Sequence, residues 1–368
     1  MKKLLICALA MLLCLPVFSQ KKAKGAASPA VAVPKAKNVI LLIGDGMGLT
    51  HISAGMYFNN NQSNFERFPV AGLQKAYSAS DLITDSAAGA TAFASGIKTY
   101  NGAIGVNTDS MPVKTILEEA EERGLATGMV VTSTLTHATP ASFVAHVRNR
   151  KFDEEIATFF LKTEIDFLAG GGKKFFEQRA ADGRNLYQEL KDKGYQVSDF
   201  TQKNASSLAP DPSKNFIYFS ADADPAKASE GRSYLAPLSV LAANHLKKRS
   251  EKGFFLMVES SQIDWGGHNN ESDYIVSEVV DFDQTIGKIL DFAAADGETL
   301  VIVTADHETG GYAISPGSEL GKIRGAFTTK GHTAQLIPVF AFGPGAELFA
   351  GVYENTAIYV KMRQVLGF

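Results

Sequence analysis

The chain has 368 residues, of which 45% are hydrophobic and 20% are charged, and its formal net charge is −3. This length is enough to bury one large core. So mild a charge gives no electrostatic reason to expect a nucleic acid or an anionic membrane as a partner.

The first twenty residues have the composition of a secretory signal peptide. Lys2 and Lys3 precede an apolar run over residues 4–18, which is too short to span a bilayer and ends near a small residue. An uncleaved anchor and a buried helix are the alternatives, and the residues before Cys14 lack the small side chains expected at a lipidated cysteine. We predict a signal peptide at residues 1–20, secretion across the inner membrane to the periplasm or the extracellular space, and no anchor after cleavage.

Cleavage there would leave a chain without thiols, because Cys7 and Cys14 are its two cysteines. Thiol catalysis is thereby excluded, and stability must come from the core, to which any bound metals would add. Residues 21–37 are rich in Ala, Lys and Pro without apolar periodicity, which predicts a flexible segment. No linker, charge block or clear repeat follows, so we expect residues 38–368 to form a single domain.

Short apolar runs alternate with helical patterns along this domain. The runs expected as buried strands are residues 39–43, 128–131, 254–258, 300–303 and 336–342. Helical spacing or a helix-ending glycine predicts helices over residues 115–123, 277–292 and 356–366. Continuous apolar strands joined by such helices are typical of an α/β fold, a three-layer sandwich whose mostly parallel central sheet is covered by helices on both faces.

The stretch from residue 151 to residue 252 gives a weaker pattern. Gly170, Gly171 and Gly172 follow an apolar run but lack the glycine spacing of a dinucleotide loop, so we expect a tight turn there. Residues 199–226 are polar and aperiodic, which predicts surface loops.

Potential metal ligands follow four of the predicted strands. In chain order they are Asp45, the stretch 136–139, Glu259 with Asp264, and Asp306 with His307. Because the carboxyl ends of parallel strands meet at one edge of a sheet, these side chains are expected to converge. The alternative for any one aspartate is a helix cap.

The histidines sharpen this prediction. Of the seven in the chain, four lie beside such strand ends or in glycine-flanked loops: His137, His268, His307 and His332. Asp264 and His268 are one helical turn apart, so both would point the same way. Carboxylate and imidazole ligands without sulfur suit zinc, whose catalytic sites keep one position open. Glu259, Asp45 and a threonine hydroxyl offer hard oxygens, which suit magnesium better.

Ser86 is the candidate nucleophile. It opens a run of small residues, 84–92, where the amides and dipole of a helix N-terminus would favour an alkoxide and an anionic phosphoryl group. The alternative is an ordinary N-cap serine on a packed, alanine-rich helix. No G-x-S-x-G motif supports an acyl-transfer hydrolase instead.

The sequence resembles the alkaline phosphatases over nearly all of residues 38–368. Six blocks carry the resemblance, in the family's order: NVILLIGDGMG at 38–48, TDSAAGATAFASGIKTYNGAIG at 84–105, HATPASFVAHV at 137–147, VESSQIDWGGH at 258–268, TADH at 304–307 and GHT at 331–333. The resemblance implies one catalytic domain that hydrolyses phosphate monoesters to an alcohol and inorganic phosphate. Ser86 would attack phosphorus in line, and water would then hydrolyse the phosphoserine.

The resemblance also implies a site with two zinc ions and one magnesium ion. The ligands of the first zinc would be Asp264, His268 and His332. Those of the second would be Asp45, Asp306, His307 and the Ser86 oxygen. Those of magnesium would be Asp45, Thr139 and Glu259, with His137 binding directly or through water.

Arg150 matches the family's phosphate-clamping arginine, and Asp85 would orient it. Two positions depart from the family's pattern. His137 stands where some bacterial members have an aspartate, a difference that would weaken selectivity for magnesium. Trp265 stands where others have a lysine or histidine, and its one neutral donor would hold phosphate less tightly. The segment from His307 to His332 is short compared with larger relatives, in which it contributes to the dimer contact, and this leaves a homodimer open.

The nearest alternative is a phosphodiesterase or phosphonate hydrolase of the same superfamily, with the same two-zinc core. The implied magnesium ligands and Arg150 favour monoesters, because a diester lacks one charged oxygen. A sulfatase would need a C/S-x-P-x-R motif, which is absent. A metal-binding protein without catalysis would leave Ser86 and Arg150 idle, and a phosphomutase fits poorly with secretion. The expected partners are therefore small-molecule phosphate monoesters.

Overall fold

A computed structural model describes residues 35–368, which belong to one compact unit, Val33–Phe368. The predicted signal peptide at residues 1–20, and most of the flexible segment predicted at 21–37, lie outside the described residues. Among residues 35–368, no helix combines the length and the apolar character that a membrane crossing requires.

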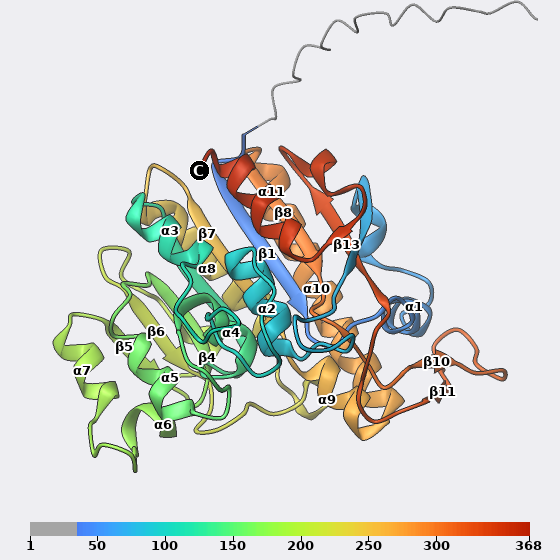
Figure 1. The fold of residues 1–368 in the computed structure, drawn as a ribbon, viewed down its shortest axis with the longest axis horizontal. Helices are drawn as coiled ribbons and strands as arrows, with labels where there is room; N and C mark the ends of the chain where they lie inside the picture. The colour runs from blue at the N-terminus through green and yellow to red at the C-terminus, as the bar shows by residue number, and fades with distance from the viewer. Residues whose placement is uncertain (1–34) are drawn as a thin grey trace, which may run out of the picture. The chain divides into compact units, whose positions relative to one another are not determined.

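The unit is built around a ten-stranded sheet in the order β14-β2-β13-β8-β1-β7-β3-β4-β6-β5 (Figure 1). Its strands are β1 (Asn38–Gly44), β2 (Val70–Lys75), β3 (Ala126–Thr134), β4 (Phe167–Gly171), β5 (Gln196–Asp199), β6 (Phe216–Phe219), β7 (Phe254–Ser260), β8 (Thr299–Thr304), β13 (Leu336–Phe342) and β14 (Gly351–Glu354). Neighbouring strands are parallel except where β13 pairs with β2 and with β8. Two small ribbons pair β9 (Glu308–Thr309) with β12 (His332–Thr333) and β10 (Ala313–Ile314) with β11 (Gly325–Ala326).

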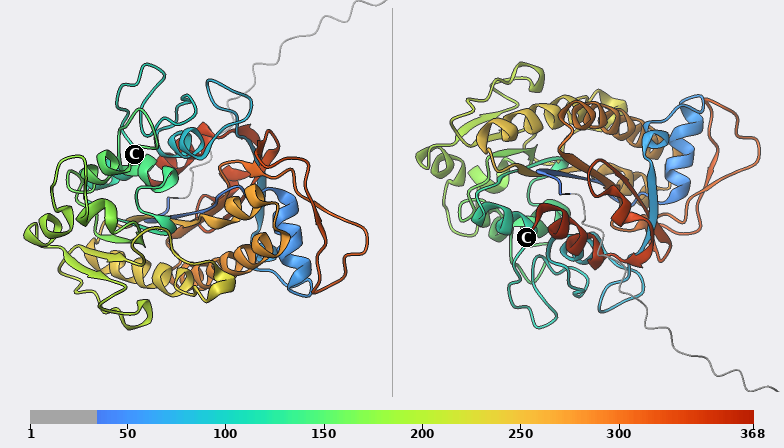
Figure 2. Two further views of the ribbon diagram at one scale, coloured as in Figure 1. Left: turned by 90° about the horizontal axis from the view of Figure 1, so that it is seen from below. Right: turned by 90° about the horizontal axis from the view of Figure 1, so that it is seen from above.

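Helices cover both faces of the sheet, as Figure 2 shows. One face carries α2 (Ser86–Ser95), α3 (Ile116–Glu122), α4 (Ala138–Val144), α5 (Asp153–Phe159), α6 (Lys174–Glu177), α7 (Leu186–Asp192) and α11 (Thr356–Leu366). The other carries α1 (Leu49–Phe58), α8 (Leu235–Arg249), α9 (Gln262–Asn269) and α10 (Ser272–Asp296). Short 3-10 helices are η1 (Asn64–Arg67), η2 (Ala205–Ser207), η3 (Ala228–Glu230) and η4 (Ala346–Phe349).

The central strand β1 explains the two-sided burial. Val39 and Leu41 point into one core, while Ile40 and Leu42 point into the other, and all four are fully buried. A strand buried on both faces must be continuously apolar, which is the pattern of residues 39–43. The predicted three-layer α/β fold with a mostly parallel sheet is confirmed.

Several predicted boundaries were wrong. Gly170 and Gly171 belong to β4 rather than to a turn. Close packing accounts for the glycines, because a Cβ at Gly170 would lie 2.6 Å from Val131 and one at Gly171 would lie 2.2 Å from the Ala223 carbonyl oxygen. The region predicted as loops, 199–226, contains β6, a buried strand too short to stand out among polar residues. The predicted helix 277–292 extends to Ser272–Asp296.

One ion pair fixes the long segment between α2 and α3. His146 Nδ1 lies 2.7 Å from the Gly105 carbonyl oxygen, and its Nε2 lies 2.9 Å from Glu118 Oε1. Because both ring nitrogens face acceptors, the protonated ring donates to both. Burial alone would lower the pKa of His146, but the hydrogen bonds to Glu118 and Gly105 outweigh it and raise that pKa. Glu118 also closes the capping box of α3 with Thr115.

We expect His146→Gln to lower the melting temperature of the metal-loaded protein more at pH 6 than at pH 9. A histidine whose pKa is raised on folding stabilises the fold below its unfolded pKa, about 6.5, and that stabilisation is lost as the pH rises through the folded pKa. Thermal melts of both proteins across this range measure the difference. Glu118→Gln should show the same trend while keeping the cap, and a difference that does not change with pH would contradict the prediction.

Candidate active site

The candidate site lies where four neighbouring strands end, in the spatial order β8, β1, β7 and β3 (Figure 1). Asp45 follows β1, and Glu259 lies near the end of β7, where it pairs in register with Ile43. Asp306 and His307 follow β8, while His137 and Thr139 stand at the start of α4, after β3. Parallel pairing therefore sets these groups side by side at one edge of the sheet.

The first of three ligand clusters joins Asp264, His268 and His332. The two Nε2 atoms lie 3.1 Å apart, and each lies within 3.5 Å of a carboxylate oxygen of Asp264. His268 Nδ1 faces the Lys330 carbonyl oxygen at 2.5 Å, and His332 Nδ1 faces that of Thr84 at 2.8 Å. A carbonyl only accepts, so both Nδ1 atoms carry the hydrogen and both Nε2 lone pairs point inward. This is the tautomer that binds a metal.

The second cluster joins Asp45, Asp264 and His307. His307 Nε2 lies 3.5 Å from Asp45 Oδ1 and 3.2 Å from Asp306 Oδ2. Asp306 Oδ1 accepts hydrogen bonds from the amides of Gly46 and His307, which leaves its Oδ2 directed into the cluster. Asp264 thus belongs to both clusters, whereas the family resemblance placed it in the first alone.

The third cluster joins Asp45, His137 and Glu259. Thr139 is fully buried, and its hydroxyl lies beside the Glu259 carboxylate. His137 Nε2 lies 3.3 Å from Arg150 Nη2, and burial lowers the pKa of His137 to about 3, so its ring is neutral. Trp265 lies edge-on to this ring, with the centroids 6.2 Å apart.

Ser86 is the first residue of α2 and is not the helix cap. Asp85 is the cap: its Oδ1 accepts a hydrogen bond of 3.0 Å from the Ala88 amide. Ser86 is 1% exposed, and its Oγ lies 3.3 Å from His307 Nε2. Asp85 Oδ2 accepts from Arg150 Nη1 at 3.1 Å, which holds the guanidinium near the same cluster. The cap alternative for Ser86 is therefore wrong.

The carboxylates of the site lack the partners that buried charges need. Both oxygens of Asp45 and the Oδ2 of Asp306 are buried without a hydrogen bond. Burial, and then repulsion among neighbouring carboxylates, raises the pKa values of Asp45, Glu259 and Asp306. Burial also lowers the pKa of His307, which keeps the imidazole neutral. Unpaired carboxylates and neutral imidazoles together fit multivalent cations.

The structure brings together every site residue predicted from the sequence. The sequence did not point to Thr309, whose hydroxyl lies 2.5 Å from Asp264 Oδ1 and 3.2 Å from His307 Nδ1. The only hint in the sequence was its position two residues after His307. That hint is weak, because threonine is common in strands for reasons unrelated to a metal site. The remaining histidines, His51, His146 and His245, belong to none of the three clusters.

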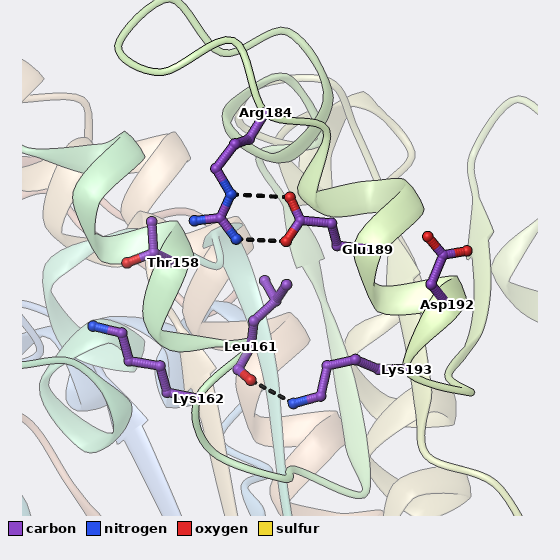
Figure 3. A pocket seen from close by; sticks show the side chains of 7 residues that line it. All are labelled: Thr158, Leu161, Lys162, Arg184, Glu189, Asp192 and Lys193. Atoms are coloured by element: carbon purple, nitrogen blue, oxygen red, sulfur yellow. Dashed lines mark hydrogen bonds and ion pairs between the residues drawn. The ribbon is translucent and has the colours of Figure 1, made fainter.

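A separate surface cavity of about 680 Å³ lies beside α5 and α7. Figure 3 shows its lining: Thr158, Leu161, Lys162, Arg184, Glu189, Asp192 and Lys193. Two of its three cations are already paired, since Arg184 Nη2 lies 2.5 Å from Glu189 Oε2 and Lys193 donates to the Leu161 carbonyl. This cavity shares no residue with the ligand clusters and offers no comparable chemistry.

Comparison with known proteins agrees with this geometry. The family model described as alkaline phosphatase matches residues 36–326. Alkaline phosphatase 3 of Bacillus subtilis is 35% identical, over 90% of this chain and 89% of that protein, and the Escherichia coli alkaline phosphatase is 33% identical, over 90% and 86%. The solved alkaline phosphatase of the Antarctic bacterium TAB5 is 45% identical with a TM-score of 0.86, over 91% of this chain and 99% of that one.

A cold-active alkaline phosphatase from Shewanella sp. also superposes, with a TM-score of 0.81 and 32% identity over 89% of this chain and 99% of that one. Fold, sequence and the arrangement of the site thus point the same way. The chain belongs to the alkaline phosphatase family, as the sequence resemblance predicted, and its activity is the hydrolysis of phosphate monoesters.

Proposed function

We propose that this phosphatase works through a phosphoserine on Ser86, at a centre of two zinc ions and one magnesium ion. The observation that carries the proposal is the placement of the Ser86 hydroxyl. It is buried, lies 3.3 Å from a metal-ligand candidate, His307, and stands on a helix whose capping aspartate also holds Arg150. Nucleophile, metal ligands and phosphate clamp are thereby joined in one site.

Each proposed metal position draws on one cluster. We assign Asp264, His268 and His332 to the first zinc, and Asp45, Asp306, His307 and Ser86 to the second. Magnesium would take Asp45, Thr139 and Glu259, with His137 beside them. The inward lone pairs of the histidines support zinc, and the oxygen-rich third cluster supports magnesium. In a solved variant of the TAB5 enzyme with one histidine changed to aspartate, magnesium is bound in the M3 site, which supports a third metal position here.

The reaction then follows from the side chains. The Arg150 guanidinium binds two phosphoryl oxygens, and Asp85 fixes its direction. Ser86 Oγ gives up its proton and forms a bond to phosphorus as the bond to the alcohol oxygen breaks, and the departing alcohol takes up a proton. A water oxygen next loses a proton and forms a bond to phosphorus, and Ser86 Oγ leaves and is protonated again. Zinc, when bound, lowers the pKa values of the hydroxyl and the water and stabilises charge on the attacking and leaving oxygens.

The proposed setting is outside the inner membrane, in the periplasm or the extracellular space. The support is the signal-like pattern of residues 1–20 and the absence of cysteine from residues 38–368, which suits an oxidising compartment. Sequencing the N-terminus of the secreted protein tests this, and a mature chain that still begins at Met1 would contradict it.

We expect Ser86→Ala to lower kcat for p-nitrophenyl phosphate by about 10³-fold or more, because the step to the covalent intermediate is lost. Mass spectrometry of acid-quenched reactions should find phosphate on the Ser86 peptide of the wild type. An unchanged circular dichroism spectrum would show that the variant keeps its fold, a control that does not depend on zinc content because Ser86 is itself a proposed zinc ligand. Wild-type turnover by Ser86→Ala would refute the nucleophile.

Dialysis against a chelator should abolish activity, since the side chains alone do not activate the hydroxyl. Zinc added back should restore hydrolysis, magnesium alone should not, and both together should give the highest rate. Metal analysis after each step provides the stoichiometry. Full activity in the chelated, metal-free protein would rule the proposed centre out.

Replacing Arg150 with lysine should lower kcat/KM for monoesters by about 10- to 100-fold, the effect of losing one or two hydrogen bonds to a charged group. Lysine keeps the positive charge but lacks the planar guanidinium group that can donate two parallel hydrogen bonds. Rates on bis(p-nitrophenyl) phosphate should fall less, because a diester lacks one charged oxygen. An equal loss of kcat/KM on both substrates would mean that Arg150 does not bind the charged oxygen that the diester lacks.

A further inference from the structure

Thr309 places a hydroxyl at the centre of the site that the proposed reaction does not use. It is the second residue of β9, is fully buried, and contacts ligands of two different clusters. Its Oγ1 lies 2.5 Å from Asp264 Oδ1 and 3.2 Å from His307 Nδ1.

The direction of these two hydrogen bonds follows from their chemistry. The Asp264 carboxylate can only accept, so the hydroxyl hydrogen of Thr309 points to it. The free lone pairs of Oγ1 then accept the hydrogen on His307 Nδ1. That tautomer leaves a lone pair on His307 Nε2, the atom that faces Ser86 Oγ and Asp306 Oδ2. One hydroxyl therefore orients a carboxylate and, together with the backbone of Glu308, fixes the tautomer of the His307 ring.

The backbone of Thr309 is tied to the other segments that carry ligands. Its amide donates to the Gly46 carbonyl at 3.1 Å, directly after Asp45, and the residue pairs with His332 across the β9–β12 ribbon. A Cβ at Gly46 would lie 2.7 Å from Thr309 Oγ1, and one at Gly267 would lie 2.8 Å from Thr309 Cγ2. The two glycines therefore pack closely on both branches of the Thr309 side chain.

We propose that Thr309 is a positioning residue that couples the two zinc sites, so that loss of its hydroxyl weakens zinc binding at both. This inference rests on the proposed two-zinc centre. Groups that hydrogen-bond metal ligands fix their orientation, and removing one typically lowers metal affinity about 10- to 100-fold. Because a single hydroxyl serves Asp264 and His307, the loss should appear at both sites together.

The test compares Thr309→Val, which keeps the shape and loses the hydroxyl, with Thr309→Ser, which keeps the hydroxyl. Zinc affinities of the metal-free proteins are measured by competition with a chromophoric chelator. Thr309→Val should bind both zinc ions about 10- to 100-fold more weakly, while Thr309→Ser should stay within about threefold of the wild type. Thr304→Val is the matched control, since that buried hydroxyl donates to the Pro338 carbonyl and touches no ligand.

Thr309→Ala covers the case in which valine does not fold, because it removes the hydroxyl without placing a methyl group against Asp264. Wild-type affinity in Thr309→Val or Thr309→Ala would overturn the coupling, as would a loss confined to one zinc. A wild-type protein that fails to bind two zinc ions would instead overturn the proposed function. The two failures are therefore distinguishable.

Discussion

The rest of the structure depends on one constraint, which is that several carboxylates are buried together at the carboxyl edge of the sheet. Asp45, Glu259 and Asp306 are fully buried, and burial raises their pKa values. Burying an unpaired carboxylate costs several kcal/mol, so the surrounding fold must hold these groups in place against their repulsion. The adjacent strands β8, β1 and β7 do this because each is buried along its whole length and apolar through its middle.

This arrangement makes the net charge of the side chains in the site negative. The site holds one arginine, Arg150, against five carboxylates: Asp45, Asp85, Glu259, Asp264 and Asp306. The side chains alone would repel a phosphate monoester, which is itself an anion. The three divalent cations of the proposed centre reverse that sign, and the sharing of Asp45 and Asp264 between clusters makes the centre one electrostatic unit.

The parts of the fold that could be predicted from the sequence are those with strong local signals. Continuous apolar runs identified β1, β7 and β8, and a carboxylate or histidine at the end of each identified the site. The edge formed by β4, β6 and β5 was missed, because four- and five-residue strands between polar loops give little periodicity. The antiparallel direction of β13 has no signature in its own residues. The contacts of Thr309 with Asp264 and His307 could not be predicted, because they depend on which distant side chains the fold places beside it.

Asp85 shows why the proposed nucleophile, Ser86, and the proposed phosphate clamp, Arg150, form one element. Its Oδ1 caps α2, and its Oδ2 accepts hydrogen bonds from the Gly102 amide and from Arg150. On the other side of α2, Gly89 packs so closely on Asp306 that a Cβ would lie 3.0 Å from the Asp306 Cβ. The helix is therefore held between the loop that carries Arg150 and the strand end that carries the proposed metal ligands. Under the proposed mechanism, these contacts would fix Ser86 relative to both and so set the position of the substrate phosphorus before substrate binds.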